Sequence, residues 1–183
     1  MASAQPKKNI QGRTDLYIVR NSPIQGKGLF AKQRIRKGTR IIEYRGERIP
    51  VGEADERYED DEKSLRHHTF LFSIDERTVI DAAVNGNNAR WINHSCDPNC
   101  EAIEEEGRIW IEAIKSIQPG QELSYNYQLD RDGRFEKRFW TLYECRCGAP
   151  DCRKIMLARP KPPKRKKTTK KTAKKHAARK KSA

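Results

Sequence analysis

Short stretches in which apolar and polar residues alternate recur along most of the chain. Such alternation, with a period of two residues, is typical of β-strands that bury one face. The polar stretch 51–68 has room for one short helix. We therefore expect a mostly β domain with a little helix and with strands near residues 14–19, 39–47, 69–75, 78–82, 108–114 and 122–127.

The segments between these strands contain turn residues. Residues 75–77 are expected to form a tight turn that pairs the strands on either side of it. Residues 21–31 contain Pro23, Gly26 and Gly28, and we expect them to form turn and loop.

Charge divides the chain into two parts. Residues 1–152 hold 24 Lys and Arg against 25 Asp and Glu, whereas residues 153–183 hold 15 Lys and Arg and no acid. A segment this polar cannot bury a core, so we expect a disordered tail whose natural partner is a polyanion such as nucleic acid. The expected organisation is an N-terminal extension, a main domain, a cysteine-containing segment and a Lys-rich tail, over residues 1–13, 14–130, 131–157 and 158–183.

Membrane and secreted classes of protein fit this sequence poorly. The longest apolar runs are only a few residues, and residues 1–12 lack the apolar core of a secretory signal. The five cysteines are odd in number, and three of them lie within eight residues. This pattern fits metal binding in a reducing compartment better than a disulfide scaffold.

The segment GKGLFA, residues 26–31, formally matches the glycine fingerprint of dinucleotide-binding folds. That fingerprint requires a helix and a crossover of a dozen or more residues before the next strand. Only seven residues separate Ala31 from Thr39, so we reject this reading. What remains is a loop whose glycines let the backbone approach a ligand closely, or an ordinary turn.

The stretch 89–100, ARWINHSCDPNC, is unusually rich in side chains that form sites. Amides and imidazoles make directional hydrogen bonds, and cysteines bind metals. Five such residues fall within eight positions: Asn93, His94, Cys96, Asn99 and Cys100. This density favours a functional site over a set of structural residues.

Three further cysteines, Cys145, Cys147 and Cys152, have the spacing C-x-C-x4-C. Thiolates this close repel one another and oxidise unless a metal binds them, and tetrahedral zinc needs a fourth ligand. Cys96 and Cys100 are the remaining cysteines, and on spacing alone either one is a candidate. The alternative is a cluster of free thiols.

Tyr125 and Tyr127 are two residues apart on a predicted strand, so their side chains face the same way. Such a pair by itself usually serves packing. Only the presence of the other motifs in the same sequence suggests that the two tyrosines have a role in a site.

Taken together and in order, these blocks resemble the SET-domain family of protein lysine methyltransferases over residues 14–157. The blocks are GKGLFA, IIEYRGE, FLFSID, VIDA, NNARWINHSC, ELSYNY and CRCGAPDCRKIML. No block is decisive alone, but the ordered set is specific and looks most similar to the chromatin-modifying branch with a post-SET zinc segment. The resemblance implies small curled β-sheets and a knot-like C-terminal thread that passes under the NHSC stretch.

The resemblance also implies the residues of the site. S-adenosylmethionine would bind on one face, lined by Lys27, Gly28, Leu29, Tyr44, Arg90, Asn93, His94, Met156 and Leu157. A peptide lysine would enter from the other face through a channel walled by Phe70 and Phe72. Tyr127 would be the catalytic tyrosine, and Tyr125 would control the number of methyl groups, with a bias towards one. One structural zinc would be held by Cys96, Cys145, Cys147 and Cys152, which leaves Cys100 unliganded.

The sequence departs from the family pattern in two places. Trp91 stands where the family usually has Phe, and Asn126 where it usually has Asp, but neither change removes an expected catalytic atom. The cysteine-rich segment that precedes the domain in many chromatin members is also missing. These features resemble the compact, stand-alone bacterial and viral members of the family.

The implied activity is methyl transfer from S-adenosylmethionine to a lysine of a basic protein, such as a histone or histone-like protein. The alternative is an inactive SET scaffold that acts as a nucleic-acid-binding architectural protein, but Asn93, His94 and Tyr127 together favour the enzyme. Residues 177–182 resemble the Ala-Arg-Lys-Ser stretch of a core-histone tail, so the protein's own tail is a further candidate substrate. The expected location is intracellular, either the bacterial cytoplasm and nucleoid or the nucleus.

Overall fold

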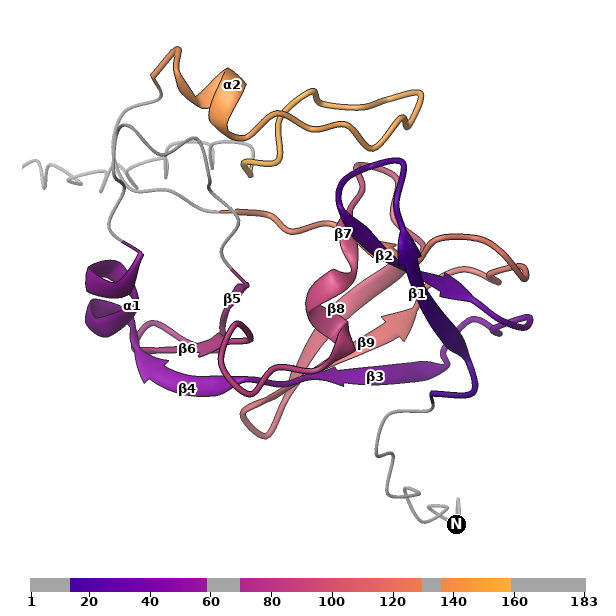
Figure 1. The fold of residues 1–183 in the computed structure, drawn as a ribbon, viewed down its shortest axis with the longest axis horizontal. Coiled ribbons are helices and arrows are strands. Elements are labelled where there is room, and N and C mark those ends of the chain that lie inside the picture. The colour runs from indigo at the N-terminus through magenta and orange to yellow at the C-terminus, as the bar shows by residue number, and fades with distance from the viewer. Residues whose placement is uncertain (1–13, 59–69, 130–135, 159–183) are drawn as a thin grey trace, which may run out of the picture.

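Small β-sheets make up most of the regular secondary structure (Figure 1). The computed structural model describes residues 14–58, 70–129 and 136–158. In chain order its elements are β1 (Tyr17–Asn21), β2 (Lys27–Ala31), β3 (Arg40–Tyr44), β4 (Glu47–Pro50), α1 (Val51–Arg57), β5 (Leu71–Ser73), β6 (Thr78–Asp81), the 3-10 helix η1 (Asn88–Trp91), β7 (Asn93–His94), β8 (Cys100–Glu105), β9 (Arg108–Ala113), β10 (Ser124–Tyr125) and α2 (Phe139–Leu142). The alternating pattern therefore predicted the fold class correctly.

The described strands form four small sheets. β1 and β2 make an antiparallel pair, β3-β9-β8 and β4-β6-β5 are three-stranded antiparallel sheets, and β10 runs parallel to β7. The expected turn between β5 and β6 is present, because the Asp75 carboxylate accepts hydrogen bonds from the backbone N–H groups of Arg77 and Thr78. β10 and β7 are far apart in sequence, so their pairing draws the end of the domain beside the NHSC stretch.

Parts of the sheet structure differ from the prediction: the short strands β4 and β7 were not predicted, and β2 and β8 differ as well. Residues 27–31 form a strand rather than loop, because they pair with β1 and bury Leu29 and Ala31, while Gly28 lies against the Glu122 carboxylate. β8 was not predicted at all. Its sequence, CEAIEE, is acidic because β8 is an edge strand, with only Cys100 fully buried.

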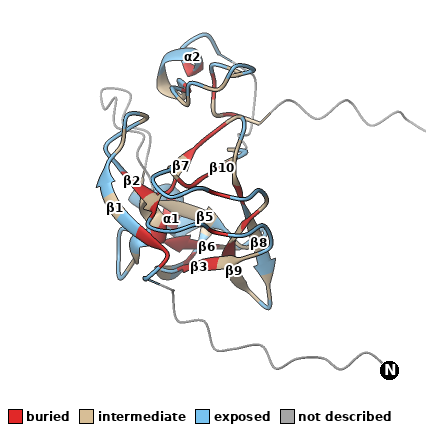
Figure 2. Cartoon of the chain, turned by 90° about the vertical axis from the view of Figure 1, so that its right-hand side faces the viewer, coloured by how far each residue is buried: buried red, intermediate tan, exposed pale blue. Residues whose placement is uncertain are grey.

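The main core lies where the sheets of the body meet. Its fully buried aliphatic side chains come from several strands and loops: Leu29, Ile35, Ile41, Ile42, Ile92, Ile109, Ile111, Ile117 and Leu123. Figure 2 shows most of the buried residues in the strands of the body and few around α2. Residues 136–158 instead have a small core of Phe139, Ile155 and Leu157, which the Leu129–Leu157 bridge joins to the body.

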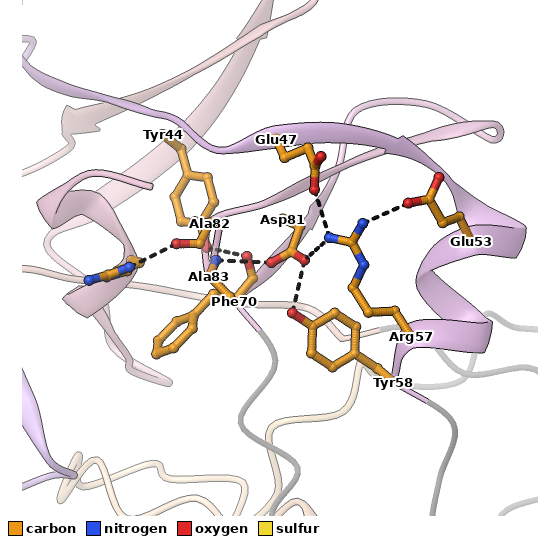
Figure 3. Close-up of polar contacts among 10 residues, drawn as sticks. Tyr44, Glu47, Glu53, Arg57, Tyr58, Phe70, Asp81, Ala82 and Ala83 are labelled. Carbon is orange, nitrogen blue, oxygen red and sulfur yellow. Dashed lines mark hydrogen bonds and ion pairs between the residues drawn. The ribbon is translucent and has the colours of Figure 1, made fainter. Parts of the chain in front are cut away.

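A polar network fixes α1 against β6 (Figure 3). The Asp81 side chain is fully buried and accepts hydrogen bonds from Arg57 Nη1 at 2.7 Å, from the Tyr58 hydroxyl at 2.9 Å and from the Ala83 N–H at 2.9 Å. Arg57 also pairs with Glu47 and Glu53 at its more exposed side. Both carboxylate oxygens of the buried charge thus accept hydrogen bonds, and one bond comes from a cation, which is what makes its burial tolerable.

Replacing Asp81 with Ala is expected to lower the free energy of unfolding by about 2–3 kcal/mol, because Arg57 and Tyr58 lose a buried acceptor. Chemical denaturation measures this loss. The matched control is Glu53→Gln, which removes a half-exposed partner of the same guanidinium and should cost under about 0.5 kcal/mol. Equal losses in the two variants would contradict the assignment.

The same network predicts acid sensitivity. Burial raises the pKa of Asp81, but the hydrogen bonds from Arg57, Ala83 and Tyr58 outweigh it and leave the pKa below its ordinary value. The stabilisation that follows is therefore present above the unfolded-state pKa of about 4 and is lost as the pH falls through the folded-state pKa.

Candidate functional site

The site is built around β7 and β10, which lie side by side as a parallel pair. The Ser95 N–H donates to the Tyr125 carbonyl at 3.1 Å, and the Tyr127 N–H donates to His94 Nδ1 at 3.1 Å. These bonds hold the two predicted catalytic tyrosines against the NHSC stretch. The Tyr127 hydroxyl returns to the same stretch and donates to the Ile92 carbonyl at 2.7 Å.

A group of aromatic side chains lies beside this pair of strands. The ring centroids of Tyr125 and Tyr127 are 4.8 Å apart, those of Phe72 and Tyr125 are 6.1 Å apart, and those of Tyr44 and Phe72 are 5.3 Å apart. A cavity of about 440 Å³ is lined by Phe72, Tyr125 and Tyr127 together with Cys100 and Asn126. The structure therefore brings together the predicted catalytic tyrosines and one of the two predicted channel residues beside an open space.

Burial raises the pKa of both Tyr125 and Tyr127, so the two phenols stay protonated at physiological pH. The Tyr127 proton is committed to the Ile92 carbonyl, which leaves the lone pairs of the phenolic oxygen available as acceptors. A neutral, oriented phenol of this kind can accept a hydrogen bond from an incoming amine.

A second aromatic group lies around Trp91 at the end of η1. The Phe70 ring meets Trp91 edge-on at 5.2 Å between centroids, and Lys27 Nζ lies 5.0 Å from the centre of the Trp91 ring. The Arg90 guanidinium lies over the same ring at 4.7 Å and donates from Nη1 to the Ala82 carbonyl. The predicted channel residue Phe70 therefore lies in this second group, whereas Phe72 lies in the first. The two groups are connected, because the Phe70 carbonyl accepts a hydrogen bond from the Tyr44 hydroxyl.

Arg90 has a feature that fits a bound polar ligand. Its Nε atom is buried and has no hydrogen-bond partner among the described residues, which is rare for a charged donor. The neighbouring Lys27 belongs to the β2 segment that was predicted to approach a ligand. An orphaned buried donor beside such a segment suits a ligand with carboxylate or hydroxyl acceptors, such as S-adenosylmethionine.

The Asn93 side chain connects the β2 segment to the β7–β10 pair. Its amide donates to the Lys27 carbonyl at 2.9 Å and to Glu122 Oε1 at 2.8 Å. Glu122 also accepts from the Ser22 hydroxyl, so one carboxylate braces both ends of the β1–β2 turn. Sequence reasoning missed Glu122, because its hydrogen-bond partners are about 30 and 100 residues away in the chain. Its place beside Gly28 is visible only in the fold, and no local sequence pattern indicates it.

The cysteine cluster has the geometry that zinc requires. The ligand atoms of Cys96, Cys145, Cys147 and Cys152 all lie within 4.8 Å of one another. The Sγ atom of Cys96 is 3.7 Å from that of Cys145 and 4.0 Å from that of Cys152. Four sulfurs at about 2.3 Å from a tetrahedral zinc ion are separated by about 3.8 Å, so these residues can hold one.

The surroundings of the cluster act on its thiols in opposite directions: burial raises the pKa of Cys96 and Cys145, whereas the pKa of Cys147 is lowered. Burial raises the pKa of Cys147, but hydrogen bonds from the backbone N–H groups of Cys96 and Ala149 lower it to about 6. Cys100 lies outside the cluster: it is fully buried in the main core, its thiol donates to Asn99 Oδ1, and burial raises its pKa to about 12. The choice between Cys96 and Cys100, open on spacing alone, is thus made by the fold.

The last two predicted cofactor residues lie in the C-terminal segment. The Met156 N–H donates to the Tyr143 carbonyl, and Leu157 packs in the small core with Phe139 and Ile155. The structure therefore places them with the cysteine segment rather than in the group around Trp91, and their role in covering the adenine stays a prediction.

The chain belongs to the SET-domain family. The family model described as the SET domain matches residues 26–128, more than half of the chain, and this confirms the resemblance seen in the sequence. The matched region contains both aromatic groups and Cys96, whereas Cys145, Cys147 and Cys152 follow it.

The chain is similar to several curated proteins. It is 43% identical over 159 residues, or 84% of this chain, to "Histone-lysine N-methyltransferase trr" of Drosophila melanogaster, and covers 6% of that protein. It is 40% identical over 72% of its length to "Histone-lysine N-methyltransferase, H3 lysine-4 specific" of Candida albicans, and covers 13% of that protein. It is 38% identical over 79% of its length to human "Histone-lysine N-methyltransferase 2D", and covers 2% of it. The chain thus corresponds to a small part of each of these relatives.

None of the helices among the described residues is long and apolar enough to cross a membrane.

Proposed function

We propose that the protein is an S-adenosylmethionine-dependent lysine N-methyltransferase that acts on a basic protein. The observation that carries this proposal is the Tyr127 phenol, which stays neutral, donates a hydrogen bond to the Ile92 carbonyl and lines the cavity together with Tyr125. Membership of the SET family and the names of the relatives support it.

When bound, S-adenosylmethionine supplies an electrophilic methyl group on a sulfonium. The residues proposed to line its pocket are Lys27–Leu29 through their backbone, together with Tyr44, Arg90, Asn93 and His94, with Met156 and Leu157 over the adenine. The buried Arg90 Nε, which has no hydrogen-bond partner in the described part of the chain, is the strongest support for this set. Glu122 joins it as a positioning residue, since it braces Asn93 and the β2 segment.

The attacking lysine must be neutral, although its free amine has a pKa of about 10.4. Burial beside a cation disfavours the ammonium form, so the proton can leave to water before transfer. The Tyr127 oxygen then accepts a hydrogen bond from the amine. This bond orients the amine so that the nitrogen lone pair points along the line of attack. The protein contributes chiefly orientation, which is worth roughly 7–11 kcal/mol of the barrier in well-aligned reactions.

One structural zinc ion is proposed on Cys96, Cys145, Cys147 and Cys152. The sulfur positions fit it, and the cluster joins residues 136–158 to the NHSC stretch. Zinc would therefore fix the C-terminal segment against the site rather than take part in the transfer.

The proposed substrate is a histone, with lysine 4 of histone H3 first, because several relatives are named for that residue. The animal and fungal sources of the relatives support the nuclear location over the bacterial one. The Lys-rich tail lies outside the described residues. Its charge supports nucleic acid as a second partner, and the tail stays a candidate substrate in cis.

The test is incubation of the full chain with labelled S-adenosylmethionine and a panel of basic proteins, histone H3 and the chain alone included, read by mass spectrometry. Transfer to a lysine supports the enzyme. Failure of the chain to bind the cofactor, together with DNA binding, would leave the inactive architectural scaffold as the function.

Tyr125→Phe is expected to raise the dimethyl-lysine fraction of the product while total turnover changes little. The Tyr125 ring is buried against Tyr127 and Phe72, so its hydroxyl occupies space that a methylated amine needs in order to turn. Mass spectrometry of a peptide product over time measures the fractions. Ready formation of trimethyl-lysine by the wild-type protein would contradict this role.

A further inference from the structure

We propose that His94 is a positioning residue that couples the metal site to Tyr127, by accepting a hydrogen bond from the Tyr127 N–H at Nδ1 and donating one from Nε2 to the Cys96 thiolate. This inference rests on the proposed zinc site. It concerns the side chain of a residue whose predicted contact was with the cofactor.

The tautomer follows from one hydrogen bond. The backbone N–H of Tyr127 lies 3.1 Å from His94 Nδ1, and an amide N–H can only donate. Nδ1 must therefore carry a lone pair, so the imidazole is neutral and its single proton is on Nε2. His94 is only 3% exposed, and this proton must find its acceptor inside the protein.

The acceptor that faces Nε2 is Cys96. The Nε2–Sγ distance is 3.5 Å, within the range of a hydrogen bond to sulfur. Cys96 Sγ also receives the Arg153 N–H at 3.4 Å. Four thiolates on one zinc ion carry a net charge of −2, and N–H donors directed at the sulfurs offset it, so His94 stabilises the loaded site.

The other side of the coupling is the position of Tyr127. The Tyr127 side chain is fixed at both ends by the stretch that leads to the metal: its hydroxyl binds the Ile92 carbonyl, and its backbone binds His94. The His94 and Tyr127 rings are in contact at 5.3 Å between centroids. Ile92 thus binds the Tyr127 hydroxyl, His94 binds the Tyr127 backbone, and Cys96 is a ligand of the proposed zinc ion.

Two variants separate the halves of the bridge. In His94→Asn the side-chain oxygen can accept from the Tyr127 N–H, but the side chain is too short to reach Cys96. In His94→Gln the amide can donate to Cys96, but no acceptor stands at the position of Nδ1. Because each variant retains one bond, a general folding defect would not produce opposite results.

The experiment measures zinc affinity by competition with a chelator and protection of the Tyr127 amide from hydrogen exchange, both on the full chain and without substrate. His94→Asn should bind zinc roughly 10- to 100-fold more weakly and keep the protection of Tyr127 when zinc is saturating. His94→Gln should bind zinc almost as tightly as the wild type and lose that protection. In the wild type, chelation should increase exchange at Tyr127.

Equal effects of both variants on both readouts, or unchanged zinc affinity in His94→Asn, would overturn the proposal. Neither readout requires methyl transfer. A protein that binds zinc as described but methylates nothing would therefore refute the proposed activity and leave the coupling intact, whereas normal transfer with unaltered zinc affinity in His94→Asn would do the reverse.

Discussion

Replacement of Tyr127 with Phe is expected to slow methyl transfer by about 100-fold or more while the protein stays folded. The hydroxyl is the only atom lost. In the structure it donates to the Ile92 carbonyl, and Tyr127 lines the cavity, so its loss removes the acceptor proposed to orient the nucleophile. The Ile92 carbonyl also loses a donor, which should lower stability by only about 1 kcal/mol.

Single-turnover rates with labelled cofactor measure the effect, and a thermal melt checks the fold. Tyr125→Phe is the matched control, because it removes a hydroxyl from a ring only 4.8 Å away and should leave the rate near that of the wild type. Turnover of Tyr127→Phe at the wild-type rate would remove Tyr127 from the mechanism. Because burial raises the pKa of Tyr127, the loss should be the same at every pH at which the substrate amine can be deprotonated.

Substitution of Cys145 with Ser is expected to remove zinc and unfold the segment that follows Tyr127. Structural zinc contributes about 10–16 kcal/mol to the folding of zinc-finger peptides, and the small core of Phe139, Ile155 and Leu157 is too limited to replace it. Elemental analysis should fall from one zinc ion per chain towards none. Hydrogen exchange of residues 136–158 should become fast, and cofactor binding should weaken.

Cys100→Ala is the matched control, since Cys100 is buried in the main core and lies outside the cluster. It should cost about 1 kcal/mol of stability and retain the full zinc content. Treatment of the wild type with a strong chelator should reproduce the Cys145→Ser result. A metal-free protein with an ordered C-terminal segment and full activity would show that the cluster does not hold a structural ion.

The sequence by itself determined the local features of this protein. The alternation of apolar residues located most of the strands, because each strand buries one face, and residues 51–57 formed the helix expected in the first polar stretch. The crowding of Cys145, Cys147 and Cys152 indicated a metal site, because the repulsion of close thiolates is a local property. The ordered set of motifs was enough to identify the family.

Local patterns misjudged β2 and β8. Gly28 looked like a turn residue, but it belongs to β2 and lies against the carboxylate of the distant Glu122. β8 has too many acids to look like a strand, yet pairing with β9 from Cys100↔Ala113 to Glu105↔Arg108 decides its conformation. In both cases the deciding partner is distant in the chain.

Only the tertiary structure decided how the site is assembled. The parallel contact of β7 with β10 brings His94 to Tyr127, and the return of the C-terminal segment selects Cys96 over Cys100 as the fourth sulfur of the cluster. The tautomer of His94 follows from the first of these contacts, because the Tyr127 N–H donates to Nδ1. Hydrogen bonds and metal geometry act over a few ångströms in space, so no periodicity or spacing along the chain encodes which distant atoms will meet.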